Sequence, residues 1–320
     1  MNNIRRISVA FAVSLALSSF SIAQIGAQQP SDDATVSKPQ TGQVKLTVSV
    51  MNRNQEAALG LTREDFSLTE NNEPRKITSF SVKDKPVSVA IVYDLSGSIN
   101  NLRLKGMSES LALFLARSNP ENEYSVISFS DQPGLVLDRV RDREAAESVL
   151  TELVALKPVG ASADYDACRL GLLTLGKSEY SKRILLVISD GVDTSSRLKL
   201  KDFSDLLKHS DATVYTLAVG DYHGRSPFAG GMTGQSLLTE MAKMTGGLIF
   251  VPKDDRELGA GLNYLAYELR HQYLLGYVPG DSTDVTKARS ITIKVAPIKD
   301  GKEQRGLVVR SRSEVFVTQN

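Results

Sequence analysis

Hydrophobic residues follow two different rhythms along the chain. In the segment VKLTVSVMN every second residue from Val44 to Val50 is apolar, which is typical of a strand buried on one face only. The segment LTREDFSLTENNEPRKITSFSVKD continues as short strands around a turn at Asn71 and Asn72. The same alternation returns after Tyr273 in YLLGYVP, RSITIKVAP and GLVVRSRSEVFV, which predict three more strands.

Between these β segments the pattern changes from Val87 onward. VSVAIVYD and RILLVISD are almost wholly apolar, as expected for strands buried on both faces of a parallel sheet, and YSVISFSD predicts another strand between them. ATVYTLAVGD and LIFV predict two more strands, and amphipathic helical patterns separate all of them. Strands that alternate with helices predict an α/β fold with a doubly wound, mostly parallel sheet.

Taken together, the two rhythms predict the domain organisation. We expect residues 43–85 and 272–318 to pack together as one small β-domain, with the α/β domain of residues 86–271 inserted between them.

The first residues have the composition of a targeting segment. A short basic head, MNNIRR, precedes the apolar run ISVAFAVSLALSSFSIA, and small residues stand where a signal peptidase cuts. We expect residues 1–23 to be a signal peptide and residues 24–42, which are polar and rich in Gln, Pro and Ser, to be a disordered leader. The alternative is a membrane anchor, but the apolar run is short for a span. The prediction is therefore export, to the periplasm, the cell surface or the medium of a bacterium, with no stable membrane span after cleavage.

Charge and cysteine content narrow the class of partner. The chain has 38 basic and 37 acidic side chains and a net charge of +1, which gives no electrostatic reason to expect a nucleic acid or an anionic membrane. Cys168 is the only cysteine, so no intramolecular disulfide forms and we expect it to be a small buried hydrophobe.

Oxygen-bearing side chains gather at one predicted edge of the sheet. Asp94 and Asp190 end apolar strands, and the carboxyl ends of parallel strands share the edge at which open α/β sheets bind ligands. Ser96 and Ser98 follow Asp94 at alternate positions, and Ser162 precedes a helix that begins at the same edge. Carboxylates and hydroxyls are hard donors that suit Mg²⁺, with Ca²⁺ or Mn²⁺ as possible substitutes.

The motif DLSGS at residues 94–98 resembles the Asp-x-Ser-x-Ser signature of von Willebrand factor type A domains. GASADYDA resembles the loop in which that family usually carries Gly-Gly-Thr, with Ser162 in place of the threonine, and VISDGVDTSS resembles the strand that supplies the last aspartate, Asp190. The resemblance implies a metal-ion-dependent adhesion site. Ser96 and Ser98 would bind the cation directly, Ser162 directly or through water, and Asp94 and Asp190 largely through water.

Both ends of the chain carry a finer resemblance. GLTREDFSLTENNEPRKITSF and ELRHQYLLGYVP are similar to the VWFA-related Acidobacterial domain family of exported bacterial proteins, over residues 44–317. This finer resemblance implies the fold and export, and the resemblance to von Willebrand factor type A domains implies a binding module, not an enzyme, whose cation takes the Asp or Glu carboxylate of a protein partner in adhesion or assembly.

Two other functions stay open from the residues alone. The first is a scaffold in which the β-domain contacts the partner and the cation only stabilises the fold. The second is a hydrolase, for which no G-x-S-x-G elbow is present and His223 is the only plausible base among three histidines.

The segment after the predicted strand ATVYTLAVGD is long and rich in glycine. Residues 221–236 follow a strand end and therefore lie on the edge of the predicted cation site. We expect Arg225 and Phe228 in this loop to border the ligand surface and to contribute selectivity.

Overall fold

The structure is a computed structural model of the 320-residue chain. It describes residues 42–99, 106–220, 223–224, 231–280, 287–296, 298–299, 302–303 and 306–316. The predicted signal peptide, the leader up to residue 41, and the candidate residues Arg225 and Phe228 all lie outside the described residues. Within the described ranges, no helix is both long and apolar enough to cross a lipid bilayer.

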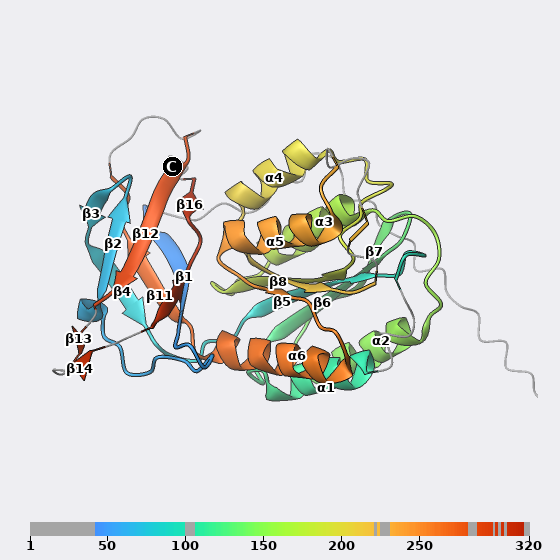
Figure 1. Ribbon diagram of the computed structural model, residues 1–320, viewed down its shortest axis with the longest axis horizontal. Coiled ribbons are helices and arrows are strands. Elements are labelled where there is room, and N and C mark those ends of the chain that lie inside the picture. Colours follow the sequence, from blue (N-terminus) through green and yellow to red (C-terminus); the bar gives the residue numbers. More distant parts are fainter. Residues whose placement is uncertain are drawn as a thin grey trace, which may run out of the picture.

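A six-stranded sheet forms the centre of the larger unit (Figure 1). The strand order is β10-β9-β8-β5-β6-β7, and all neighbouring strands are parallel except β6 and β7. The bounds are β5 (Ser88–Asp94), β6 (Glu123–Phe129), β7 (Pro133–Val140), β8 (Arg183–Ser189), β9 (Thr213–Ala218) and β10 (Ile249–Phe250). This confirms the predicted α/β fold with a mostly parallel sheet.

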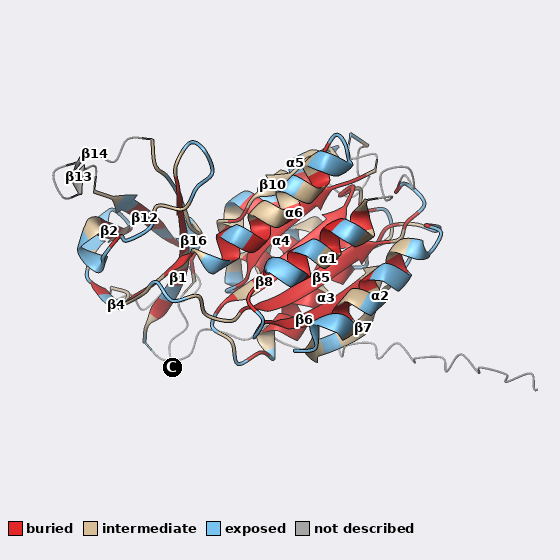
Figure 2. Cartoon of the chain, turned by 90° about the horizontal axis from the view of Figure 1, so that it is seen from below, coloured by how far each residue is buried: buried red, intermediate tan, exposed pale blue. Residues whose placement is uncertain are grey.

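Helices cover both faces of this sheet, as Figure 1 shows. One face packs against α1 (Met107–Arg117), α2 (Arg143–Ala155) and α6 (Asp255–Arg270). The other packs against α3 (Asp164–Gly176), α4 (Leu200–His209) and α5 (Gly234–Thr245). All seven residues of β5 are buried because successive side chains alternate between the two apolar layers. The buried strands and the exposed outer faces of α1 and α2 are visible in Figure 2.

Local sequence accounts for where several helices begin and end. The Asp142 carboxylate accepts hydrogen bonds from two backbone N–H groups of the first turn of α2, and Asp254 accepts one from Glu257 at the start of α6. These are N-caps, which satisfy amide groups that lack a partner within the helix. Gly246 ends α5 with a φ of 85°, a left-handed conformation that glycine adopts without steric cost.

The two ends of the chain form a smaller unit of two antiparallel sheets, seen beside the central sheet in Figure 1. One sheet has the order β15-β1-β11-β4 and the other β16-β12-β2-β3. Their bounds are β1 (Val44–Met51), β2 (Phe66–Glu70), β3 (Glu73–Arg75), β4 (Ile77–Ser81), β11 (Tyr273–Tyr277), β12 (Arg289–Val295), β15 (Val308–Arg310) and β16 (Glu314–Val315). A short 3₁₀ turn (Arg63–Asp65) and the hairpin of β13 (Ile298–Lys299) and β14 (Lys302–Glu303) complete this unit.

The pairing of β1 with β11 and of β2 with β12 joins strands from opposite ends of the chain. One apolar cluster, which includes Leu46, Phe66 and Leu275, fills the space between these strands. The domain boundaries at residues 86 and 271 stay a prediction.

Two elements differ from the sequence-based expectation. β7 is absent from the prediction because it is an edge strand whose residues are mostly half-buried, so it lacks a continuous apolar run. GLVVRSRSEVFV was predicted to be one strand and is instead β15 and β16, which belong to different sheets. The break lies where the half-buried Arg312 side chain donates hydrogen bonds from its guanidinium to the carbonyl oxygens of Lys208 and Ala212.

A buried ionic contact fastens the smaller unit to the larger one. The Glu268 side chain of α6 has no exposed surface. It accepts hydrogen bonds from Ser49 of β1 (2.7 Å) and Tyr215 of β9 (2.6 Å), and it forms an ion pair with Arg310 of β15. These contacts compensate the cost of burying the carboxylate.

We therefore expect Glu268→Gln to lower the free energy of unfolding by about 3–5 kcal/mol, because Arg310 keeps its charge and loses its counter-ion. Urea titration measures the change. Glu240→Gln, at an exposed position of α5, is the matched control and should stay within about 0.5 kcal/mol of the wild type. Equal stabilities of the two variants would contradict the role given to Glu268.

Candidate metal centre

Three carboxylates meet at the carboxyl edge of the central sheet. Asp94 ends β5, Asp190 follows β8, and Asp164 opens α3. One oxygen from each lies within 4.8 Å of the other two. The three side chains are almost fully buried, with 2%, 0% and 3% of their residues' surface exposed in that order.

Serine hydroxyls surround these carboxylates. Asp94 Oδ1 accepts a hydrogen bond from the Ser96 backbone N–H at 2.7 Å, and Ser96 Oγ lies 3.2 Å from Ser98 Oγ. Ser162 Oγ donates to Asp164 Oδ2 at 2.6 Å. The structure thus gathers Asp94, Ser96, Ser98, Ser162 and Asp190 at one edge, and their role as metal ligands stays a prediction.

Ser189, the last residue of β8, lies between two of the carboxylates. Its Oγ lies 2.7 Å from Asp94 Oδ2 and 2.6 Å from Asp164 Oδ1, and it accepts a hydrogen bond from the Gly191 N–H. A hydroxyl has one hydrogen to donate. It can therefore donate to only one of these two carboxylates at a time, and a proton or a cation would relieve the repulsion between them.

The pKa values move in the direction that this geometry requires. Burial, with a further contribution from the charge of Asp190, raises the pKa of Asp94 to about 6, although hydrogen bonds from Ser96 oppose the rise. Burial and the neighbouring charge of Asp94 also raise the pKa of Asp164 well above its ordinary value. No basic side chain in the described part of the chain forms an ion pair with either residue.

Backbone hydrogen bonds hold the three surrounding loops in register. Gly97 N–H donates to Gly160 O at 3.0 Å, which joins the loop after β5 to the loop before α3. Gly160 has a φ of 88°, and a Cβ there would lie 2.5 Å from Asp131 Oδ2, so the loop requires glycine at this position. Ser162 N–H donates to Thr194 Oγ1 at 2.9 Å, and Thr194 N–H donates back to Ser162 O at 2.8 Å.

Other acidic residues near the edge accept hydrogen bonds from the backbone of these loops. Asp131 accepts a hydrogen bond from Ala161 N–H at 2.9 Å, and Asp166 accepts bonds from Arg197 and Leu198 N–H at 2.8 and 3.1 Å. Asp193 caps the start of α3 by accepting a bond from Tyr165 N–H. Each of them fixes the backbone that presents the central cluster.

Asp164 and Ser189 were missed by the sequence reasoning. Asp164 lies in the first turn of a helix, where an acidic residue is favourable because of the helix dipole alone, and Asp166 two residues later has the same sequence signal. Only the direction of the side chain separates them, since Asp164 points into the cluster and Asp166 reaches a neighbouring loop. Ser189 was read as the end of a buried strand, and its contacts come from tertiary structure.

The donor set fits a divalent cation. All the side chains in the cluster offer oxygen, which is the donor that Mg²⁺, Mn²⁺ and Ca²⁺ prefer. Ser98 and Gly97 are exposed, whereas the carboxylates beneath them are buried. The carboxylates are therefore buried beneath a loop whose outer residues, Gly97 and Ser98, face solvent.

Part of the chain is similar to a known domain family and to one curated protein. Residues 89–192 match the family described as von Willebrand factor type A domain. An uncharacterized protein of Borreliella burgdorferi is 24% identical over 185 residues, which cover 52% of this chain and 54% of that protein. The chain thus spans about half the length of the curated relative that it matches.

Solved structures with a similar fold have low sequence identity to this chain. A von Willebrand factor type A protein from Catenulispora acidiphila is 12% identical, with a TM-score of 0.48 over 87% of this chain and 75% of that one. An aerotolerance-related membrane protein from Bacteroides fragilis is 19% identical, with a TM-score of 0.44 over 57% of this chain and 98% of that one. The manganese-loaded TRAP protein of Plasmodium vivax is 13% identical, with a TM-score of 0.43 over 79% of this chain and 100% of that one.

In the presence of a chelator, we expect Asp94 to make stability fall as pH rises from about 4 to about 6. The pKa of Asp94 is about 6 in the folded chain and 3.8 ordinarily, so between these values the folded state binds the proton and the unfolded state does not. Folding is therefore favoured at the acid end of this window, and the benefit is lost as pH rises through the folded pKa. Urea titrations at fixed pH measure the slope, and Asp94→Asn should flatten it. A wild-type slope no steeper than that of Asp94→Asn would contradict the assignment.

Asp164→Asn is expected to stabilise the chelated protein near neutral pH by about 0.5–2 kcal/mol, because a neutral amide replaces a buried carboxyl whose ionised form is unfavourable beside Asp94. The same change should weaken divalent-cation binding, which isothermal titration calorimetry measures with Mg²⁺, Mn²⁺ and Ca²⁺ in turn. The matched control is Asp166→Asn in the same helical turn, which should lose loop hydrogen bonds and leave cation affinity nearly unchanged. If both variants affect cation binding equally, Asp164 has no special place in the cluster.

Proposed function

We propose that this chain, whose residues 89–192 match the von Willebrand factor type A domain family, is a binding module whose divalent cation captures an acidic group of a protein partner. Asp94, Ser96, Ser98, Ser162 and Asp190 would hold the cation, with Asp164 as a further carboxylate beside them. The bound cation supplies a concentrated positive charge that a partner's Asp or Glu carboxylate can meet.

The buried carboxylate cluster is the observation that supports this proposal most directly. Three carboxylates whose oxygens lie within 4.8 Å of one another cannot all be ionised in a buried site without a compensating positive charge. A proton compensates at low pH. Near neutral pH a divalent cation does so with the oxygen donors already present.

The surface over the cluster supports a role in binding. Gly97 and Ser98 lie over the cluster and are exposed, and Val159 beside Gly97 is 58% exposed. Val159 N–H donates to Leu95 O at 2.8 Å, so this apolar side chain is held at the rim of the site. A partner residue next to the captured carboxylate would pack against it.

Mg²⁺ is the first choice of cation, with Ca²⁺ and Mn²⁺ as alternatives. Mg²⁺ is usually bound through one or two carboxylates and several waters, whereas Ca²⁺ accepts more oxygen ligands in a more flexible geometry. Asp164 adds a third carboxylate to the two that the sequence predicted. Because Mg²⁺ usually takes only one or two carboxylates, Ca²⁺ and Mn²⁺ should be tested beside it. Export of the chain, the absence of an enzymatic activity, and the contribution of Arg225 and Phe228 to the ligand surface belong to the same proposal.

Affinity capture tests the proposed function. We expect Asp94→Ala to lose the partners that the wild-type chain retains in Mg²⁺, and we expect a chelator to release those partners from the wild type. Asp202→Ala, at an exposed position of α4, is the matched control and should behave as the wild type does.

Circular dichroism and thermal melting of the same samples separate this function from the scaffold alternative. If the chelator lowers the melting temperature and leaves partner binding intact, the cation only stabilises the fold and the β-domain carries the interaction. If Asp94→Ala retains every partner in Mg²⁺, the proposed capture of a carboxylate is wrong.

A further inference from the structure

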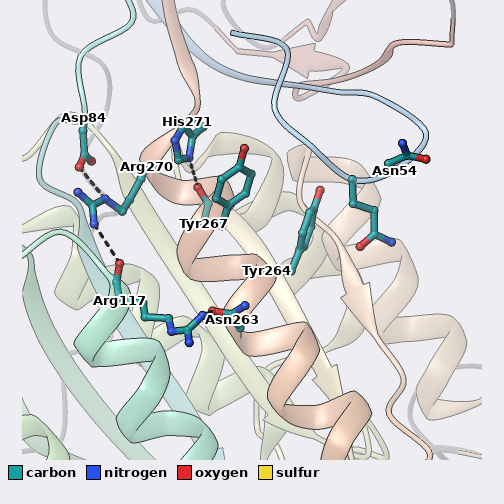
Figure 3. A pocket seen from close by; sticks show the side chains of 9 residues that line it. Asn54, Asp84, Arg117, Asn263, Tyr264, Tyr267, Arg270 and His271 are labelled. Atoms are coloured by element: carbon teal, nitrogen blue, oxygen red, sulfur yellow. Dashed lines mark hydrogen bonds and ion pairs between the residues drawn. The ribbon is translucent and has the colours of Figure 1, made fainter.

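A second site lies at the seam between the two units. A cavity of about 510 Å³ is bounded by the ends of α1 and α6 and by the loop that follows β1 (Figure 3). α6 ends at the amino edge of the central sheet, where the buried Lys182 ammonium, just before β8, donates to Leu269 O. The cavity and the carboxylate cluster therefore lie at opposite edges of the same sheet.

The cavity contains one guanidinium without a counter-ion. Arg270 forms an ion pair with Asp84, with 2.8 Å between Nε and Oδ2, so their charges cancel. Arg117 donates to the amide oxygen of Asn263 and forms no ion pair with any residue that the structure describes. A guanidinium has five N–H donors in a planar fork, and most of those of Arg117 are left for a ligand.

The wall opposite Arg117 is held in place by its own hydrogen bonds. Asn52 Oδ1 accepts from the N–H groups of Asn54 and Glu56 at 2.8 and 3.0 Å, which closes the loop after β1. Ala57 N–H donates to the Tyr267 hydroxyl of α6 at 3.2 Å. Gln55, which lines the cavity, has a φ of 64°, a conformation that costs energy unless the surroundings impose it.

The aromatic wall is also fixed. The Tyr267 ring packs on His271 with 4.1 Å between ring centroids, and Tyr264 packs edge-on against Phe250. Figure 3 shows the two tyrosines standing between the β1 loop and the arginines. A cavity with walls held in this way needs little rearrangement to accept a ligand, which reduces the entropic cost of binding.

We infer that this cavity binds a small polyhydroxylated monocarboxylate of the sugar-acid class. Its volume is within the range of small-molecule sites. A carboxylate matches the planar fork of Arg117, and the single uncompensated positive charge matches a single negative one. Because Asp84 already pairs with Arg270, a dianion would keep one negative charge without a partner in the cavity.

The remaining lining groups favour hydroxyls over an apolar body. Asn54, Gln55, Asn263 and the phenol of Tyr267 line the cavity and offer both donors and acceptors. An apolar ligand would bury these groups without partners, which costs affinity. Hydroxyls on several carbons satisfy them, and the tyrosine rings provide flat surfaces for the carbon skeleton.

Titration calorimetry of the chelated protein tests the inference, since chelation prevents a carboxylate from binding through a cation at the other edge. D-glucuronate should bind, and D-glucose, acetate and D-glucose 6-phosphate should each bind at least about 10-fold more weakly. D-glucose lacks the carboxylate, and acetate lacks the hydroxyls. D-glucose 6-phosphate carries a phosphate with more than one negative charge in place of the carboxylate. Equal or tighter binding of any one of the three overturns the assigned ligand class.

Substitution of the guanidinium tests the site itself. Arg117→Gln should weaken glucuronate binding by about 10-fold or more. Arg63→Gln, at an exposed arginine that is paired with Glu64 in the smaller unit, should bind as the wild type does. Thermal melting of both variants verifies that they are folded. If folded Arg117→Gln binds glucuronate with wild-type affinity, or if the wild type gives no binding at 10 mM ligand, the inference is wrong.

Discussion

The structure depends above all on how buried negative charge is compensated. A carboxylate that leaves water without a partner costs several kcal/mol, so a folded chain must supply a counter-charge, a hydrogen-bond network or a proton. This chain buries carboxylates at both edges of its central sheet and solves the problem differently at each. At one edge the buried charge is paired and holds the two units together. At the other edge Asp94 and Asp164 have no ion-pair partner among the described residues, and with Asp190 they form the candidate metal site.

At the amino edge the compensation is internal. Glu268 receives a guanidinium from β15, a hydroxyl from β1 and a phenol from β9, so the two units of the chain close around a satisfied charge. At the carboxyl edge Asp94, Asp164 and Asp190 have serine hydroxyls and backbone amides around them. Burial, together with the negative charges of the neighbouring carboxylates, raises the pKa values of Asp94 and Asp164. A carboxyl edge in this condition suits an external cation, and through it an external partner.

The seam between the units adds a third environment. There Arg270 is neutralised by Asp84, and Arg117 is left with its charge uncompensated in a polar cavity. The protein thus offers a net negative cluster at one edge of the sheet and a net positive cavity near the other.

The sequence by itself determined the α/β sheet, because strands buried on both faces are mostly apolar, as β5 is from Val89 to Val92. It also placed Asp94, Ser96, Ser98, Ser162 and Asp190 at one edge, because the carboxyl ends of parallel strands are bound to meet there. Tertiary structure decided the rest. Asp164 and Asp166 share one helical turn and one sequence signal, yet packing turns the first into the cluster and the second toward a loop. The edge strand β7 and the cavity around Arg117 likewise depend on contacts between distant segments, which no local pattern of residues records.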